Sequence, residues 1–177
     1  MTLYKKRYRI ESIRLPNYDY SQEGEYFITI CTQDRQHLFG EIVNNEMQLS
    51  EFGKIAQLCW EQIPEHFNSA TLDEFVIMPN HVHGIIILND NNRIEISNSR
   101  KEEFSKPVSG SIPTIIRSYK SAVTKKINEL RKTLGEKVWQ TGFYESIIKE
   151  PTELYFVQEY IKNNPHNWKE DELRKAA

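Results

Sequence analysis

The sequence contains little of what marks disulfide-stabilised, membrane-spanning or secreted proteins. Its only two cysteines, Cys31 and Cys59, lie in separate apolar segments without CxxC spacing, so we expect reduced core residues rather than a disulfide or metal site. No run of about 18 apolar residues occurs, which argues against a membrane span. The basic stretch MTLYKKRYRIESIRL has neither the apolar segment nor the small-residue cleavage site of a secretory signal. These absences predict a cytoplasmic protein with no membrane partner.

What is present suffices for one folded domain. The chain has 177 residues, of which 38% are hydrophobic and 11% aromatic, and its mean hydropathy is −0.64. Domains of this length bury most of the surface that their unfolded chains expose. One segment, 89–110, is polar and charged without a sustained period. We therefore expect a single domain over 1–177 with a polar, flexible insertion at 89–110.

The charges are segregated along the chain, although the net charge is only −2. Residues 1–15 carry five basic side chains and one acidic, and residues 115–138 carry seven basic and two acidic. Residues 21–75 carry ten acidic and two basic side chains. A basic stretch is typical of a nucleic-acid contact, but also of a solvated helix face. Charge alone therefore leaves nucleic-acid binding open.

The hydrophobic periodicity predicts an α+β fold. Runs rich in β-branched and aromatic residues alternate with two long segments whose apolar residues recur at three and four. The resulting order β-α-β-β-α-β, followed by one more helix, is the ferredoxin-like pattern. The expected strands cover 25–32, 71–78, 81–88 and 138–148, the helices cover 50–67, 112–134 and 152–163, and a hairpin covers 37–50 around Asn44 and Asn45.

Two histidines are candidate metal ligands. His81 and His83 begin an apolar strand, and residues i and i+2 of a strand lie on the same face, about 6–7 Å apart along the chain. Their imidazoles could therefore converge on one cation. The alternative is a pair of hydrogen-bonded structural histidines after a tight turn, because short motifs produce many false positives.

The last predicted helix supplies a possible nucleophile and a further ligand. Tyr160 and Asn164 stand at i and i+4, so they share one helical face. The amide could join a metal while the phenol points at a phosphate. Taken singly, Tyr160 is more typical of an ordinary core or surface tyrosine, since the chain has nine tyrosines, and Asn164 before Pro165 is typical of a helix end.

Several segments resemble one family when they are taken together. FVIMPNHVHGIIIL, WQTGFYESII and YIKNNP, in this order, are similar to the REP-associated tyrosine transposases, which belong to the HUH single-tyrosine transposases of insertion-sequence type. RLPNYDYSQEGEYFITICTQDRQHLFGE and TIIRSYKSAVTKKINEL also resemble the family. The resemblance covers most of residues 14–165.

The resemblance implies an activity and a role for each motif residue. It implies a DNA transposase and single-strand endonuclease that cleaves and rejoins hairpin-forming DNA through a 5′-phosphotyrosine intermediate. His81 and His83 match the pair that binds a divalent ion, Mg²⁺ or Mn²⁺. Tyr160 matches the nucleophile, and Asn164 matches the third ligand on the helix.

The charge map indicates which residues would contact the DNA backbone. The basic stretches at 1–15 and 115–138 are suited to tracking phosphates, with a steep dependence on salt. No GxxxxGK[ST] loop occurs, so we expect no nucleotide cofactor. The candidate DNA-binding residues are Lys5, Lys6, Arg7, Arg9, Arg117, Lys120, Lys125 and Lys126.

Two other functions and two assembly states stay open at this point. A ferredoxin-like sheet could be a non-catalytic nucleic-acid-binding module, and such a module would tolerate the loss of Tyr160. A metal-dependent phosphohydrolase would use water as the nucleophile and form no covalent adduct. A monomer is favoured, and a homodimer is the alternative.

Overall fold

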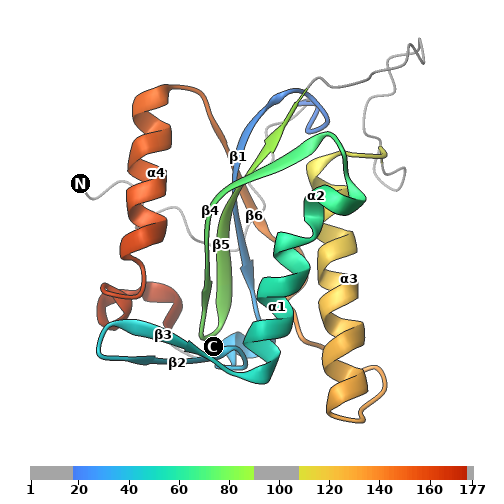
Figure 1. The fold of residues 1–177 in the computed structure, drawn as a ribbon, viewed down its shortest axis with the longest axis vertical. Coiled ribbons are helices and arrows are strands. Elements are labelled where there is room, and N and C mark those ends of the chain that lie inside the picture. The colour runs from blue at the N-terminus through green and yellow to red at the C-terminus, as the bar shows by residue number, and fades with distance from the viewer. Residues whose placement is uncertain (1–17, 90–107, 175–177) are drawn as a thin grey trace.

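The computed structural model describes residues 18–89 and 108–174, and it centres on a four-stranded antiparallel sheet in the order β4-β5-β1-β6 (Figure 1). A separate two-stranded sheet, β2-β3, forms the hairpin. The strands are β1 (Gly24–Cys31), β2 (Gly40–Val43), β3 (Glu46–Leu49), β4 (Ala70–Met78), β5 (His81–Leu88) and β6 (Tyr144–Ile148). The helices are α1 (Glu51–Glu61), α2 (Ile63–His66), α3 (Ile112–Leu130) and α4 (Pro151–Asn163), and 3₁₀ turns span Gln33–Arg35, Trp168–Glu170 and Glu172–Arg174.

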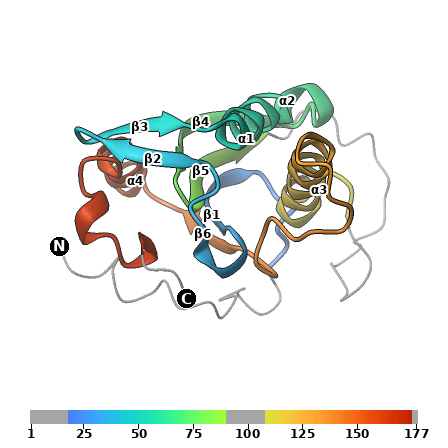
Figure 2. The same cartoon turned by 90° about the horizontal axis from the view of Figure 1, so that it is seen from below.

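The predicted ferredoxin-like class is confirmed. The strands of the main sheet occur along the chain in the order β1, β4, β5 and β6. Helix α1 lies between β1 and β4 in the sequence, and α3 lies between β5 and β6. In the sheet, β1 lies between β5 and β6. The additional helix, α4, follows β6. The helices α1, α2 and α3 cover one face of the sheet and α4 covers the other (Figures 1 and 2).

Each face of the sheet has its own hydrophobic core. Along β5 the even-numbered residues face α1 and α3, and the odd-numbered residues face α4. Gly84 is required on the first face, because a Cβ atom at this position would collide with the ring of Trp60. On the second face Phe27 and Ile85 pack against Val157 and Ile161 of α4. That packing holds α4 against the central strands β1 and β5.

The predicted helix over 50–67 is divided in two. Ser50 caps it as expected, since its side-chain oxygen accepts a hydrogen bond from the backbone N–H of Gly53 at 3.1 Å. The helix α1 ends at Glu61, and α2 follows as a short helix with Pro64 in its first turn. Proline lacks the backbone N–H and clashes with the carbonyl four residues earlier, so a continuous helix is interrupted here.

Two other predicted elements are shorter in the structure. The helix over 112–134 ends at Leu130, and Lys132 has a φ of +56°, which is incompatible with a continued helix. The strand over 138–148 begins at Tyr144, because Gly142 turns the chain with a φ of +76°. Trp139 pairs only through an isolated bridge with Thr32.

The remaining predicted elements are confirmed, with the hairpin turning at Asn44 and Asn45, whose φ values are +52° and +65°. Across the two described ranges, no helix is both long and apolar enough to cross a bilayer. The candidate DNA-binding residues Lys5, Lys6, Arg7 and Arg9, and most of the predicted insertion at 89–110, lie outside the described residues.

Candidate metal and nucleophile site

The two histidines lie side by side at the start of β5, on the face covered by α4. Both side chains are fully buried, and their ring centroids are 4.4 Å apart. They converge because β5 is regular over His81–Leu88, so alternate side chains leave the same face of the sheet. The sequence prediction that the pair shares one face therefore holds in the structure.

Neighbouring polar side chains orient both imidazole rings. Asn80 donates from its amide nitrogen to the carbonyl oxygens of Leu173 and Arg35, at 2.6 and 3.2 Å, which fixes its amide orientation. Its Oδ1 then accepts a hydrogen bond from Nδ1 of His81 at 2.8 Å. A proton on Nδ1 leaves the lone pair on Nε2 of His81, which is the nitrogen that a metal would use.

His83 is held from the neighbouring strand. Thr29 lies directly opposite His83 in the β1–β5 register, and its Oγ1 is 2.8 Å from Nδ1 of the imidazole. Both groups are buried. With Nδ1 engaged by the hydroxyl, Nε2 is the nitrogen of His83 that faces the hydroxyl of Tyr160.

Removing the Thr29 hydroxyl tests this support for His83. We expect Thr29→Val to lower the free energy of unfolding by about 1–3 kcal/mol, because Nδ1 of a buried imidazole loses its hydrogen-bond partner. Thr29→Ser keeps the hydroxyl and serves as the control, with a smaller loss for the missing methyl group. Urea unfolding of the three proteins measures the difference. Equal stability of Thr29→Val and wild type would contradict the assigned role.

Burial keeps both histidines neutral at neutral pH. It lowers the pKa of His83 to about 3. Burial also holds the pKa of His81 well below its usual range, and the nearby His83 lowers it further, while the side chain of Asn164 opposes these effects. Neutral imidazoles keep the lone pairs that metal coordination needs.

Asn164 brings a third donor to the pair. It follows the last residue of α4, is 97% buried, and lies close enough to His81 to influence its pKa. Yet in the described part of the chain neither Nε2 of His81 nor Oδ1 of Asn164 completes a hydrogen bond of acceptable geometry. Buried polar atoms without a hydrogen bond are rare in folded proteins. A cation bound between Nε2 of His81 and Oδ1 of Asn164 would give both atoms a partner.

Tyr160 is positioned beside the same site. Its hydroxyl lies 3.3 Å from Nε2 of His83, and its ring packs edge-to-face on Phe27 of β1, with centroids 6.0 Å apart. The aromatic contact and the burial of Val157 and Ile161 in the same helix fix the direction of the phenol. The fold thus brings together two segments that are far apart in the sequence, the strand with His81 and His83 and the helix end with Tyr160 and Asn164.

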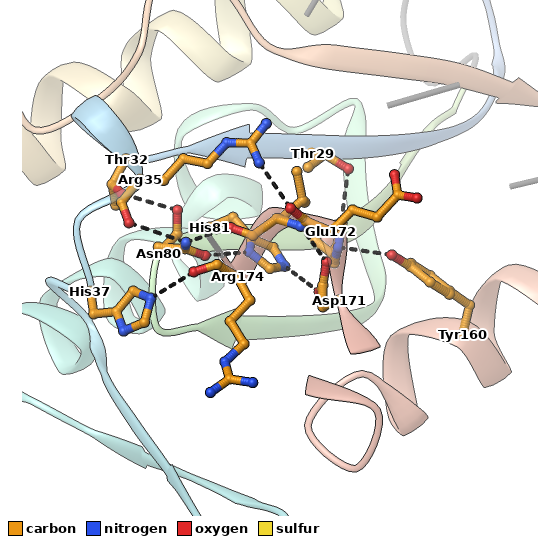
Figure 3. Close-up of polar contacts among 12 residues, drawn as sticks. Thr29, Thr32, Arg35, His37, Asn80, His81, Tyr160, Asp171, Glu172 and Arg174 are labelled. Atoms are coloured by element: carbon orange, nitrogen blue, oxygen red, sulfur yellow. Dashed lines mark hydrogen bonds and ion pairs between the residues drawn. The ribbon is translucent and has the colours of Figure 1, made fainter. Parts of the chain in front are cut away.

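One further residue beside the histidines, Asp171, was not predicted from the sequence. Its carboxylate lies in the C-terminal segment, residues 165–174, with Oδ2 3.8 Å from Nε2 of His81 (Figure 3). Ligand atoms of His81, His83 and Asp171 all lie within 4.8 Å of one another. Asp171 follows the helix end without hydrophobic periodicity or a motif, so no sequence signal pointed to it.

The described basic candidates lie elsewhere. Arg117, Lys125 and Lys126 are exposed on α3, on the sheet face opposite α4 (Figure 2). Lys120 is half-buried, and its Nζ donates to the carbonyl oxygens of Gln140 and Gly142 at 2.7 and 2.8 Å. Lys120 therefore holds the loop before β6, in addition to any contact with DNA.

Comparison with known proteins relates the chain to two sequences. The chain is 40% identical over 166 residues to an uncharacterized protein of Haemophilus influenzae, covering 92% of this chain and 91% of that protein. It is 27% identical over 151 residues to a second Haemophilus influenzae protein named "Putative REP-associated tyrosine transposase", covering 83% of this chain and 73% of that protein. No model of a known protein family matches.

A solved structure shares the fold. It is the structure of a REP-associated tyrosine transposase bound to a REP hairpin, and it aligns with a TM-score of 0.55 at 17% identity. The alignment covers 90% of this chain and 76% of that chain. At this identity the likeness establishes a common fold, including the sheet and the C-terminal helix.

Proposed function

Because this chain belongs to the same family as its 40% identical Haemophilus influenzae relative, and resembles the REP-associated tyrosine transposases in sequence and fold, we propose that it is a transposase. It cleaves and rejoins single-stranded DNA that folds into hairpins, and it does so in the cytoplasm as a monomer. The observation that carries the proposal is the approach of the Tyr160 hydroxyl to Nε2 of His83, at 3.3 Å, beside His81 and Asn164.

The residues at this site fit a divalent metal ion, Mg²⁺ or Mn²⁺. Nε2 of His81, Nε2 of His83 and Oδ1 of Asn164 would hold the ion. In the described ranges, two of these buried atoms, Nε2 of His81 and Oδ1 of Asn164, have no hydrogen bond of acceptable geometry. Amide oxygens are typical donors for Mg²⁺ and Mn²⁺, and imidazole nitrogens bind divalent first-row metals. When bound, the ion would polarise the scissile phosphate and offset the negative charge that develops during displacement.

Tyr160 supplies the nucleophile. Its phenol oxygen attacks the phosphorus, the bond from phosphorus to the 3′ oxygen breaks, and the 3′ oxygen takes up a proton. The products are a 5′-phosphotyrosine and a free 3′-OH, and attack by another 3′-OH reverses the reaction without an energy-supplying cofactor. The single lone pair on Nε2 of His83 can accept a hydrogen bond from the phenol or bind a metal, but not both. With a metal on this nitrogen, the phenol proton would pass to water.

The DNA backbone contacts α3 and the basic N-terminal residues. Arg117, Lys125 and Lys126 project from the exposed side of α3, and Lys120 lies on the same helix. The residues Lys5, Lys6, Arg7 and Arg9 add four charges in the sequence. Neutralised phosphates release counterions, so binding should weaken steeply as salt rises.

Removing the exposed charges of α3 should weaken binding without affecting the nucleophile. We expect the triple variant Arg117→Ala, Lys125→Ala and Lys126→Ala to bind hairpin DNA less tightly. The slope of log K against log salt should become less negative by about 2 to 3. Fluorescence anisotropy at several salt concentrations measures both quantities. Lys54→Ala, which removes an exposed lysine from α1, is the control. An unchanged slope in the triple variant would remove α3 from the DNA interface.

A denaturing gel tests the proposed reaction. The full chain is incubated with end-labelled single-stranded hairpin DNA, with Mn²⁺ or with EDTA. A covalent protein–DNA band that requires Mn²⁺ is the expected result. Free cleavage products without a covalent band would instead indicate a hydrolase that uses water. Binding without cleavage across a panel of hairpins would indicate a non-catalytic binding module.

A further inference from the structure

We propose that Asp171 is the anionic ligand of the metal site, joining the two histidines from the C-terminal segment. The inference rests on the proposed metal dependence and adds a residue to that site. The carboxylate Oδ2 of Asp171 lies 3.8 Å from Nε2 of His81, and the side chain of Asp171 is only 9% exposed. A carboxylate this close to two neutral imidazoles completes the mixed nitrogen and oxygen donor set that divalent first-row metals bind.

The distances are close to those of a coordinated ion. Donor atoms about 2.1 Å from one ion lie about 3.0 Å apart at right angles and about 3.4 Å apart at tetrahedral angles. The carboxylate-to-imidazole distance of 3.8 Å exceeds these values by about 0.4 to 0.8 Å, and no two ligand atoms of the three residues are more than 4.8 Å apart. Small side-chain movements would therefore bring the three donors onto one ion.

Hydrogen bonds hold the C-terminal segment in a position that places Asp171 beside His81. Arg35 donates to the carbonyl oxygen of Glu172 at 3.0 Å, and His37 donates to that of Arg174 at 3.1 Å (Figure 3). The backbone N–H of Leu173 donates to Oδ1 of Asp171 at 2.7 Å. With Oδ1 used in this way, Oδ2 is the carboxylate oxygen that approaches His81.

One buried side chain connects this segment to the histidine pair. Asn80 accepts from Nδ1 of His81 and donates to the carbonyl oxygen of Leu173, at 2.8 and 2.6 Å. Trp168 adds an aromatic contact, with its ring centroid 6.0 Å from that of His81. The position of Asp171 is thus coupled to the orientation of the imidazole that shares the proposed metal.

The charge of the donor set gives a physical reason for a carboxylate. Two neutral imidazoles and an amide leave a buried divalent ion with its full charge, which is costly to hold away from water. One carboxylate halves that charge and still leaves a net positive centre for a phosphate oxygen. A site with Asp171 should therefore bind metal more tightly than the histidines and amide alone.

Calorimetric titration of the full chain with Mn²⁺, in the absence of DNA, tests the assignment. We expect Asp171→Asn to weaken Mn²⁺ binding by about 10-fold or more. Removing a residue that only hydrogen-bonds to a metal ligand typically weakens metal affinity by about 10-fold or more, and loss of a ligand should cost at least as much. Glu172→Gln is the matched control, because it removes an exposed carboxylate next along the chain, and it should bind like the wild type. Unchanged affinity in Asp171→Asn would overturn the proposal.

His81→Ala in the same titration separates this inference from the proposed function. If His81→Ala loses Mn²⁺ binding and Asp171→Asn does not, only the role of Asp171 fails. If both bind like the wild type, the histidine site fails as well. A wild-type crystal structure with Mn²⁺ gives a second test that needs no variant. Oδ2 of Asp171 at about 2.2 Å from the ion supports ligation, and an ion without a carboxylate contact overturns it.

Discussion

Tyr160→Phe is expected to abolish the covalent protein–DNA adduct, lowering its rate of formation by at least about 10³-fold. The phenol oxygen is the only atom removed, so the edge-to-face contact with Phe27 and the packing of α4 should persist. Affinity for hairpin DNA should stay close to that of the wild type, because it rests on the basic residues. A denaturing gel measures the adduct, and anisotropy measures the affinity.

The matched control for this variant is Tyr155→Phe. Tyr155 lies on the same helix and loses the same hydroxyl, but its side chain is 59% exposed and outside the group around the histidines. It should form adduct at the wild-type rate. An undiminished adduct in Tyr160→Phe would exclude this residue as the nucleophile, whatever the effect on cleavage.

His81→Ala and His83→Ala should each eliminate metal-dependent cleavage while sparing DNA binding measured in EDTA. Each substitution removes one of two converging Nε2 donors, and a metal site rarely survives the loss of a ligand. We expect adduct formation to fall by at least about 10²-fold at a fixed Mn²⁺ concentration. Titration of the adduct yield against Mn²⁺ would show whether a higher concentration restores it.

His166→Ala is the control for the histidine variants. His166 is exposed and lies two residues after Asn164, the proposed third ligand. Its replacement therefore tests for a general effect of losing a histidine near α4. Thermal unfolding of all three variants checks that the buried substitutions leave a folded chain. Full adduct formation by either His81→Ala or His83→Ala would remove the metal role from that residue.

The parts of the fold that could be predicted are those in which local periodicity and packing agree. The strand His81–Leu88 and the shared face of its two histidines follow from a two-residue period. The division of the helix after Glu61 could have been anticipated from Pro64, whereas the apolar stripe continues through Ile63 and favoured one helix. The spacing of apolar side chains shows which face of a helix is buried. It does not show that Pro64 lacks the backbone N–H that a continuous helix needs.

The site was predictable only where a motif marks it. His83 and Tyr160 meet although 77 positions separate them, and the family resemblance, not the spacing, connected them. Asp171 has no such mark, because its position depends on hydrogen bonds from Arg35 and Asn80 to the backbone of the following residues. Contacts of this kind depend on the tertiary fold and leave no local pattern in the sequence.

The position of the basic residues also depends on the tertiary fold. The sequence indicated a basic helix but not its face, and the structure places α3 and α4 on opposite sides of the sheet (Figure 2). DNA that contacts Arg117 on α3 and Tyr160 on α4 must therefore pass from one face of the sheet to the other. A hairpin with a single-stranded extension has the flexibility for such a path, unlike a rigid duplex.

The most direct test of the central claim is to identify the residue and the bond in the covalent product. Adduct formed with hairpin DNA and Mn²⁺ is digested with nuclease and protease, and the nucleotide-bearing peptide is sequenced by mass spectrometry. We expect one modified peptide, joined through the oxygen of Tyr160 to a 5′-phosphate. Linkage at any other residue, or through a 3′-phosphate, would contradict this claim.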